Sequence, residues 1–182
     1  MMTAEQFRAW PGDGTGRLYQ LIDGELVAMA PPTVEHGTLQ ARLAIRLGQH
    51  LATHRPGCEV VVTPGVQPRP DAAHNVRIPD LAVTCAPRRG PFLADPLLIV
   101  EILSPSNIRE TREAVRACLT LPSLREVLIL SSIAIAAEVH LRDEAGIWPA
   151  EPRCFGPGGI LTLDSLGFAC PMDDLYAGLG LT

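Results

Sequence analysis

The stretch LLIVEILSPS (residues 97–106) decides the fold, because it is an apolar run with one acid, Glu101, in its middle. Side chains of a strand alternate between two faces. Apart from Glu101, both faces of this run are apolar, which predicts a central strand covered on both sides. A second apolar run begins directly after Asp80 in VRIPDLAVTC (residues 76–85). An ionised carboxylate inside such a strand is costly unless it has a partner, so both acids need an explanation.

The composition is that of a globular protein. Of the 182 residues, 47% are hydrophobic and 19% are charged, and no apolar run approaches the roughly 18 residues of a membrane span. The net charge of −5 argues against a general nucleic-acid-binding surface. All 15 basic residues are arginine, so the chain can do no chemistry that needs a lysine. The N-terminus has no basic segment followed by an apolar one, and we expect a cytoplasmic protein.

The cysteines predict no special site. Their number is odd and they are widely spaced, so neither a disulfide framework nor a zinc site is indicated. We expect buried free thiols in a reducing cytoplasm, at Cys58, Cys85, Cys118, Cys154 and Cys170.

Periodicity and turn signals predict a single α/β domain over residues 1–182. The pair Asp23-Gly24 predicts a hairpin over residues 17–31. Leucines at four-residue spacing predict a long helix that begins after the N-cap Thr33 and ends before Pro56. The strand that follows it is expected to have a partner beginning near Val76.

The second half of the chain predicts one more main helix, further strands and a short C-terminal helix. The helix begins after Asn107, which with Glu110 resembles a capping box. Strands are expected in EVLILSS (residues 126–132) and in AIAAEVHLR (residues 134–142). Together these elements predict a mixed or antiparallel central sheet flanked by about two main helices.

Two explanations of the strand acids follow from the residues alone. Asp80 and Glu101 together could hold one hard cation, Mg²⁺ or Mn²⁺, because such ions prefer carboxylate oxygens. A metal held in this way activates water and neutralises charge on a phosphate. The alternative is structural, with each acid paired to an arginine or capping a turn.

The order of motifs resembles the Uma-two family of restriction-endonuclease-like proteins, which are related to the PD-(D/E)XK nucleases. The resemblance rests on YQLIDGELVAM, PPTVEHGTL, VRIPDLAV, PLLIVEILSPSN and REVLILSS. It implies a restriction-endonuclease-like core with a mixed β-sheet flanked by helices. It also implies a metal site at Asp80, Glu101 and the backbone carbonyl of Ile102. His36 is implied as a contact to the site or to a phosphate, and Glu25 as a supporting residue; an ordinary helix-start histidine and a surface acid are the alternatives.

The chain departs from the family pattern at the lysine. Leu103 stands two residues after Glu101, and the helical position that carries the lysine in the family aligns with Val115. One turn later stands Leu119, which gives a helix face suited to dry packing. Further departures are Ser131 and Gln20. Arg112, one turn before Val115, is the nearest replacement for the lysine, and its alternative is a solvated helix face shared with Arg109 and Arg116.

Two functions are therefore predicted. The first is a metal-dependent DNA endonuclease with Asp80 and Glu101 as metal ligands and catalytic groups and Arg112 as an imperfect lysine replacement. The second is a non-catalytic descendant of the same fold that acts as a binding or assembly module. A homodimer is expected in either case, with residues 133–139 as an exposed apolar edge.

Overall fold

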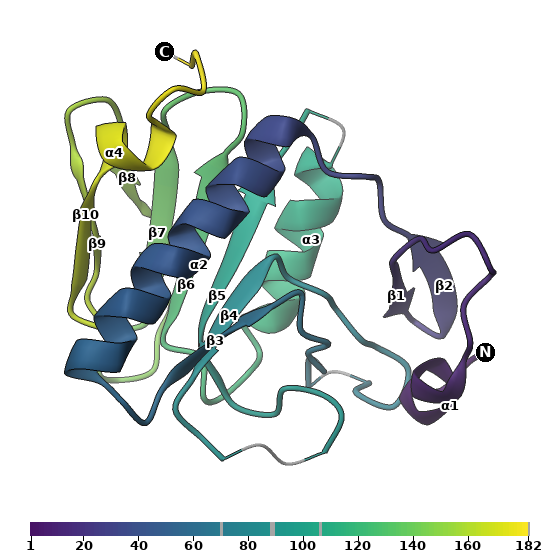
Figure 1. The fold of residues 1–182 in the computed structure, drawn as a ribbon. Helices are drawn as coiled ribbons and strands as arrows, with labels where there is room; N and C mark the ends of the chain where they lie inside the picture. Colours follow the sequence, from purple (N-terminus) through teal and green to yellow (C-terminus); the bar gives the residue numbers. More distant parts are fainter. Residues whose placement is uncertain (70, 88–89, 106, 182) are drawn as a thin grey trace.

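A six-stranded mixed sheet forms the centre of the molecule (Figure 1). The structure is a computed structural model that describes residues 1–69, 71–87, 90–105 and 107–181. The strand order is β3-β4-β5-β6-β7-β8, in which β5 and β6 are parallel and all other neighbours are antiparallel. The strands are β3 (Glu59–Val62), β4 (Leu81–Thr84), β5 (Pro96–Leu103), β6 (Glu126–Ser131), β7 (Ala137–Leu141) and β8 (Arg153–Phe155). The expected mixed sheet is confirmed.

The central strand β5 is covered on both faces, as its sequence predicts. Leu98, Val100 and Ile102 face the core beneath helix α2 (Val34–His54). Ile99 faces a second core beneath helix α3 (Ile108–Cys118). The two helices lie on opposite faces of the sheet in Figure 1. Glu101 is therefore an acid on the α3 face of a fully covered strand.

Helix α2 forms where the leucine spacing predicts it. The side chain of Thr33 accepts a hydrogen bond from the backbone N–H of His36 and so caps the first turn. Leucines at four-residue spacing then line one buried stripe, at Leu39, Leu43, Leu47 and Leu51. The helix ends at His54, two residues before Pro56, which cannot continue it.

Smaller elements surround this core. Helix α1 (Ala4–Ala9) precedes the predicted hairpin of β1 (Tyr19–Ile22) and β2 (Glu25–Ala28). Asp23 and Gly24 both have positive φ in its two-residue turn, as the favoured hairpin turns require. A second hairpin, β9 (Ile160–Leu163) and β10 (Phe168–Pro171), leads into helix α4 (Met172–Tyr176). No helix in the described part of the chain is long and apolar enough to cross a membrane.

The expectation of five buried free thiols is wrong. Cys58 and Cys85 form a disulfide, and Cys154 is exposed; only Cys118 and Cys170 are buried thiols. The cause is the antiparallel register of β3 and β4, which pairs Glu59 with Thr84. The next residues outward on the two strands are the two cysteines, which the register therefore places side by side.

Three other expectations are corrected. Asn107 is the N-cap of α3, but its Oδ1 accepts from Ser104 N–H at 2.7 Å and makes no capping box. The partner of β3 begins at Leu81, because Val76 instead bridges Leu21 of the first hairpin. Residues 133–139 do not form an edge of the sheet, because β7 lies between β6 and β8.

Candidate metal and phosphodiesterase site

The two strand acids lie on the same face of the sheet, on neighbouring strands. Leu81 pairs with Val100, so Asp80, one residue before Leu81, lies beside Glu101, one residue after Val100. Ala82 and Ile99 both contribute to the α3-side core. Since strand side chains alternate, Asp80 and Glu101 face that same side. The predicted convergence of the two acids thus follows from the β4–β5 register.

Asp80 is held by backbone and side-chain contacts. Its Oδ2 accepts from the backbone N–H of Ile102 at 2.7 Å, and its Oδ1 lies 3.3 Å from Nε2 of His36. Its carbonyl oxygen accepts from Nε2 of Gln40 at 2.8 Å and from the N–H of Thr63 at 3.0 Å. These contacts join the first half of α2, the residue after β3 and the end of β5 at one residue, through both its carboxylate and its backbone carbonyl.

Glu101 is a buried acid beside another acid. Only 8% of its surface is exposed. Burial first, and then the neighbouring charge of Asp80, raise the pKa of Glu101 well above its ordinary value, while Arg77 opposes this effect. No ion pair to Glu101 within 4.0 Å is found among the described residues. A cation placed between the two carboxylates would favour the ionised form of both.

His36 lies beside Asp80, with its Nε2 at 3.3 Å from Oδ1 of that carboxylate. It lies in the first turn of α2 and is 7% exposed, and its Nδ1 is buried with no hydrogen-bond partner in the described structure. Both the predicted contact to the site and the alternative of an ordinary helix-start histidine are compatible with this buried contact to Asp80.

Ile102 contributes its backbone. Its N–H donates to Asp80, and the next residue, Leu103, accepts at its carbonyl from Ser132 N–H on the β6 side. Backbone groups of successive strand residues point to opposite neighbours. The carbonyl of Ile102 therefore points towards the β4 side, where Asp80 lies.

Two predicted residues lie elsewhere. Glu25 is exposed at the start of β2, and none of its contacts in the described structure is to Asp80 or Glu101. Arg112 donates two hydrogen bonds, at 2.5 and 2.6 Å, to the carboxylate of Glu138 on β7. This pairing explains its position: the guanidinium is directed to the β7 side of α3.

The helix face at the aligned lysine position is dry, as its sequence predicts. Val115 is buried in the α3-side core, and Leu119 packs against the same core. The indole N–H of Trp148 donates to the carbonyl of Leu119 at 3.0 Å. Among the described residues, the buried face of α3 carries the hydroxyl of Thr111 but no charged group that could replace the lysine.

Arg77 is the residue that sequence reasoning missed. Its positive charge opposes the rise in the pKa of Glu101 and of Cys118. Its Nε is buried and has no hydrogen-bond partner in the described structure. The available signal was its place three residues before Asp80 in VRIPD.

The donor set fits a hard cation bound through few protein ligands. Within the described residues, no group of three or more His, Cys, Asp and Glu side chains is arranged to hold a metal ion. Two carboxylates and one carbonyl, completed by water, match the preference of Mg²⁺ for oxygen ligands and retained waters. Cys118 is not suited to the role, because burial raises the pKa of its thiol to about 12.

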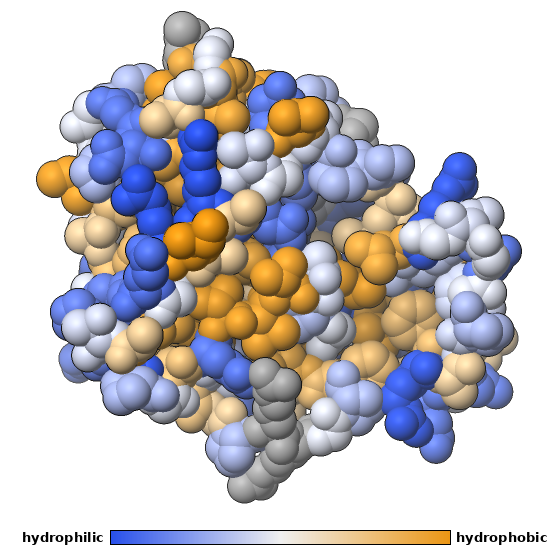
Figure 2. Space-filling model, viewed as in Figure 1, coloured by the Kyte–Doolittle hydropathy of each residue, from blue (hydrophilic) through white to orange (hydrophobic). Residues whose placement is uncertain are grey.

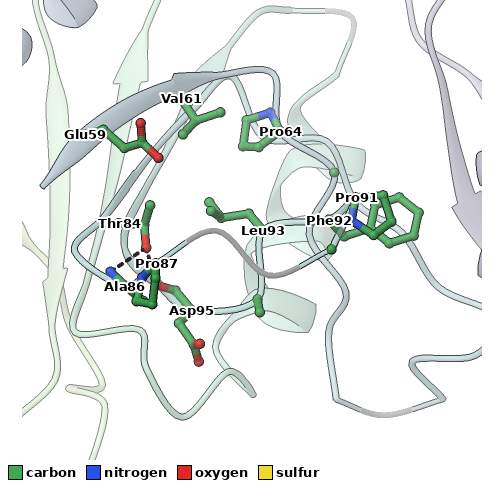
Figure 3. Close-up of a pocket in the computed structure, with 13 residues that line it drawn as sticks. Glu59, Val61, Pro64, Thr84, Ala86, Pro87, Pro91, Phe92, Leu93 and Asp95 are labelled. Carbon is green, nitrogen blue, oxygen red and sulfur yellow. Dashed lines mark hydrogen bonds between the residues drawn. The ribbon is translucent and has the colours of Figure 1, made fainter.

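A separate cavity of about 230 Å³ lies at the other end of β4 (Figure 3). Glu59, Thr84 and Asp95 contribute to its wall, together with the apolar Phe92 and Leu93. A Cβ on Gly65 would come within 2.6 Å of the ring of Phe92, so this glycine permits the close packing of the wall. The cavity includes neither Asp80 nor Glu101 among the residues that line it and is distinct from the acid pair.

Comparisons with known proteins agree with the fold. The family model described as "Uma2: Putative restriction endonuclease" matches residues 4–173. A protein of Synechocystis sp., named "Uncharacterized protein slr1290", is 26% identical over 182 residues, covering 98% of this chain and 93% of that protein. A crystal structure from Anabaena variabilis, described as a putative nuclease belonging to DUF820, superposes with a TM-score of 0.79 at 17% identity, covering 98% of this chain and 99% of the other. From the extent of the family match, the chain belongs to the Uma2 family of restriction-endonuclease-like proteins.

Proposed function

We propose that this protein is a metal-dependent endonuclease that hydrolyses phosphodiester bonds in DNA. The observation that carries the proposal is the pair of buried carboxylates, one just before β4 and one on the neighbouring strand β5; burial first, and then the charge of Asp80, raise the pKa of Glu101. Membership of a family described as restriction endonucleases supports the same chemistry. Asp80, Glu101 and the carbonyl of Ile102 would hold Mg²⁺ or Mn²⁺.

The bound cation would activate a water and neutralise charge on the phosphate. The water oxygen forms a bond to phosphorus, one P–O bond to the sugar breaks, the water proton leaves to solvent and the leaving oxygen takes up a proton. The chain's own residues orient this reaction: the N–H of Ile102 and the imidazole of His36 fix Asp80. Loss of the family's lysine predicts slow turnover, since removal of one charged donor commonly costs about 10²–10³-fold in rate.

Metal binding tests the proposal directly. Titration calorimetry with Mg²⁺ and with Mn²⁺ should give one binding event for the parent protein and none for Asp80→Ala. Glu110→Ala, which removes an exposed acid on α3, is the matched control and should bind as the parent does. If neither ion changes the heat or the thermal midpoint of the parent, the metal site is refuted. The same titration of Glu25→Ala decides whether Glu25 supports the site.

The second candidate function is a non-catalytic module. The dry packing of Val115 and Leu119 and the pairing of Arg112 with Glu138 favour it, because they remove the positions where a lysine could act. A plasmid-nicking assay separates the two functions. Nicking that depends on Mn²⁺ and is lost in Asp80→Ala supports the endonuclease; metal binding without nicking supports the module.

We also propose a homodimer, with a different surface from residues 133–139. Strand β3 is an outer strand of the sheet, and a shallow apolar groove lies between it and the second half of α2. Ile45 and Val62 expose 59% and 54% of their surfaces there, and Figure 2 shows apolar side chains gathered in this region. Two copies could pair their β3 edges in antiparallel fashion. Light scattering of Val62→Lys, expected to be monomeric where the parent is dimeric, tests this.

A further inference from the structure

We propose that Gln40 is a positioning residue that holds Asp80 in place as a ligand for the cation. This inference rests on the proposed endonuclease function and adds a residue to it. Gln40 is a half-buried polar residue on the face of α2 that also carries His36 and Leu43. Its effect on the cation would pass through Asp80.

The backbone of Asp80 lies just outside the β3–β4 ladder. That ladder ends where Val62 pairs with Leu81, so the carbonyl of Asp80 depends on donors from outside it. The residue before Asp80 is Pro79, which has no N–H and cannot anchor this part of the chain by donating a hydrogen bond. A carboxylate at such a position keeps a fixed direction only if other contacts hold its backbone.

Two donors from separate segments hold that carbonyl. Nε2 of Gln40 donates to it at 2.8 Å, and the backbone N–H of Thr63 donates to it at 3.0 Å. Because a carbonyl oxygen only accepts, the amide nitrogen of Gln40 is the atom that points at Asp80. A carbonyl oxygen has two lone pairs, so these two hydrogen bonds satisfy it fully.

The second donor is kept in an unfavourable conformation. Thr63 has a φ of +46°, in the left-handed region that β-branched residues rarely adopt. Such a conformation persists only where the surrounding contacts determine it, and examples cluster at active sites and ligand-binding segments. The residue directly after β3 is thus held with its N–H directed at Asp80.

The same helix also reaches the carboxylate of Asp80. His36 lies four residues before Gln40, and side chains at that spacing share one helix face. Nε2 of His36 is 3.3 Å from Oδ1 of Asp80, and Oδ2 accepts from the N–H of Ile102 at 2.7 Å. Helix α2 therefore contacts Asp80 at both its backbone and its side chain. Removal of the Gln40 contact should let the residue shift and so misplace its carboxylate.

A neutral donor suits this position. Lysine or arginine could also donate to the carbonyl of Asp80, but the added positive charge would repel a divalent cation at the acid pair. The amide of Gln40 holds the backbone without adding that charge. Residues that orient a metal ligand in this way commonly contribute about 10–100-fold to metal affinity.

The first measurement of the test needs no cation. In the metal-free protein, the N–H of Ile102 is protected by its bond to the carboxylate of Asp80, and that of Thr63 by its bond to the carbonyl. In Gln40→Met, which has a side chain of similar length but no donor, hydrogen exchange followed by NMR should become about 2- to 10-fold faster at both amides. Gln49→Met changes an exposed glutamine on the same helix and is the matched control, with parental exchange expected.

The second measurement is titration calorimetry with Mg²⁺ and with Mn²⁺. Gln40→Met should bind either ion about 10–100-fold more weakly than the parent. Gln40→Ala removes the amide without placing another group against Asp80 and should lose affinity to a similar extent. Gln49→Met should bind as tightly as the parent.

The inference requires both effects in the Gln40 variants, the faster exchange confined to the amides bonded to Asp80 and the weaker binding of the cation. Either effect without the other overturns it. A uniform increase in exchange that extends to Leu128, in the middle of β6, would show that Gln40 only stabilises the fold, and would overturn it too.

Failure of the proposed function gives a different result from failure of Gln40. If the parent binds neither Mg²⁺ nor Mn²⁺, the cation site fails, and the role of Gln40 in supporting it fails as well. If the parent binds either ion and both Gln40 variants bind it with parental affinity, only the role of Gln40 is refuted.

Discussion

At the scale of single residues, the main feature is an acid kept where acids are unfavourable. Glu101 is buried next to Asp80, and its pKa is raised. In the described structure, Arg77 supplies the one positive charge that opposes this rise. Such an arrangement stabilises the protein less at neutral pH than an uncharged group would. It is retained because the charge serves a purpose other than stability, which we infer to be the binding of a cation.

Replacement of Glu101 by Gln should stabilise the metal-free protein at neutral pH. The folded-state pKa of Glu101 is raised, so its contribution to stability is fully present below the ordinary carboxyl pKa and is lost as the pH rises through the raised value. The advantage of Glu101→Gln should therefore grow with pH, to roughly 0.5–2 kcal/mol. Urea denaturation of both proteins at a series of pH values, without divalent ions, measures it; parallel stability profiles would contradict it.

Arg112 should contribute to the stability of the fold. This contribution should change with pH in the direction opposite to that of Glu101. The hydrogen bonds of Arg112 lower the pKa of Glu138, so the stability of this pair is present above the ordinary carboxyl pKa and is lost as the pH falls through the lowered value. Both side chains are partly exposed, which limits the effect to about 0.5–1 kcal/mol. Arg112→Ala should lose that stability at neutral pH and match the parent in acid, as thermal denaturation would show. Arg109→Ala is the control, and a cost that persists at low pH would argue against this pairing.

At the scale of elements, a buried carboxylate at the start of β6 holds the β9–β10 hairpin in place. Glu126 is fully buried and accepts from the N–H groups of Asp164 and Ser165 at 3.1 Å each and from the hydroxyl of Ser165 at 2.6 Å. Arg153 on β8 lies 3.5 Å from the same carboxylate. The turn between β9 and β10 is thereby fixed to the start of β6, an inner strand of the sheet, through one side chain.

Loss of that carboxylate should loosen the hairpin. Glu126→Ala leaves two backbone N–H groups without an acceptor and should cost about 2–3 kcal/mol of unfolding free energy, whereas Ser165→Ala, which removes one hydroxyl, should cost about 1 kcal/mol. Chemical denaturation gives both values, and hydrogen exchange should show faster exchange at Asp164 and Ser165 in the first variant. Equal costs for the two variants would show that the N–H groups find another acceptor.

The elements with local signals were predictable, and those that depend on long-range register were not. The leucine spacing of α2, the Asp23-Gly24 turn and the alternation along β5 all lie within one segment. The disulfide depends on how β3 aligns with β4, and the orientation of Arg112 depends on Glu138, 26 residues further along the chain. The acid pair was predicted because Glu101 interrupts an apolar run, Asp80 directly precedes another, and the family resemblance implies a shared site for the two. Arg77 carries no such mark, since an arginine before a strand is ordinary in sequence, and its effect on the pKa of Glu101 follows only from the fold.

At the scale of the whole molecule, the site is assembled from segments far apart in the sequence. In the candidate site, the start of α2 carries His36, the segment before β4 carries Asp80, and β5 carries Glu101 and Ile102. The sheet register aligns the last two segments, and the cross-strand disulfide fastens the strand that follows Asp80 to β3. The stability of the site and that of the sheet are thus linked.

Removal of the disulfide should destabilise the protein as a whole. Cys58 and Cys85 are separated by 27 residues, and closing a loop of that size stabilises the folded state by about 3 kcal/mol through the entropy of the unfolded chain. The double variant Cys58→Ser/Cys85→Ser should have a lower thermal midpoint than the parent. The decrease should be similar to the one that a reductant causes in the parent. Cys154→Ser is the control and should respond to reductant as the parent does. If the midpoint of the parent does not change on reduction, the bond contributes nothing to stability.

The same covalent ring encloses Asp80 and Arg77 but leaves out Glu101. Reduction of the disulfide would therefore make the position of Asp80 less fixed. Glu101 would keep its position on the central strand β5. If the proposed cation site is present, two samples of identical sequence, one purified with dithiothreitol and one without, should differ in their affinity for magnesium. Laboratories that compare the behaviour of this protein should match the thiol content of their buffers before they compare anything else.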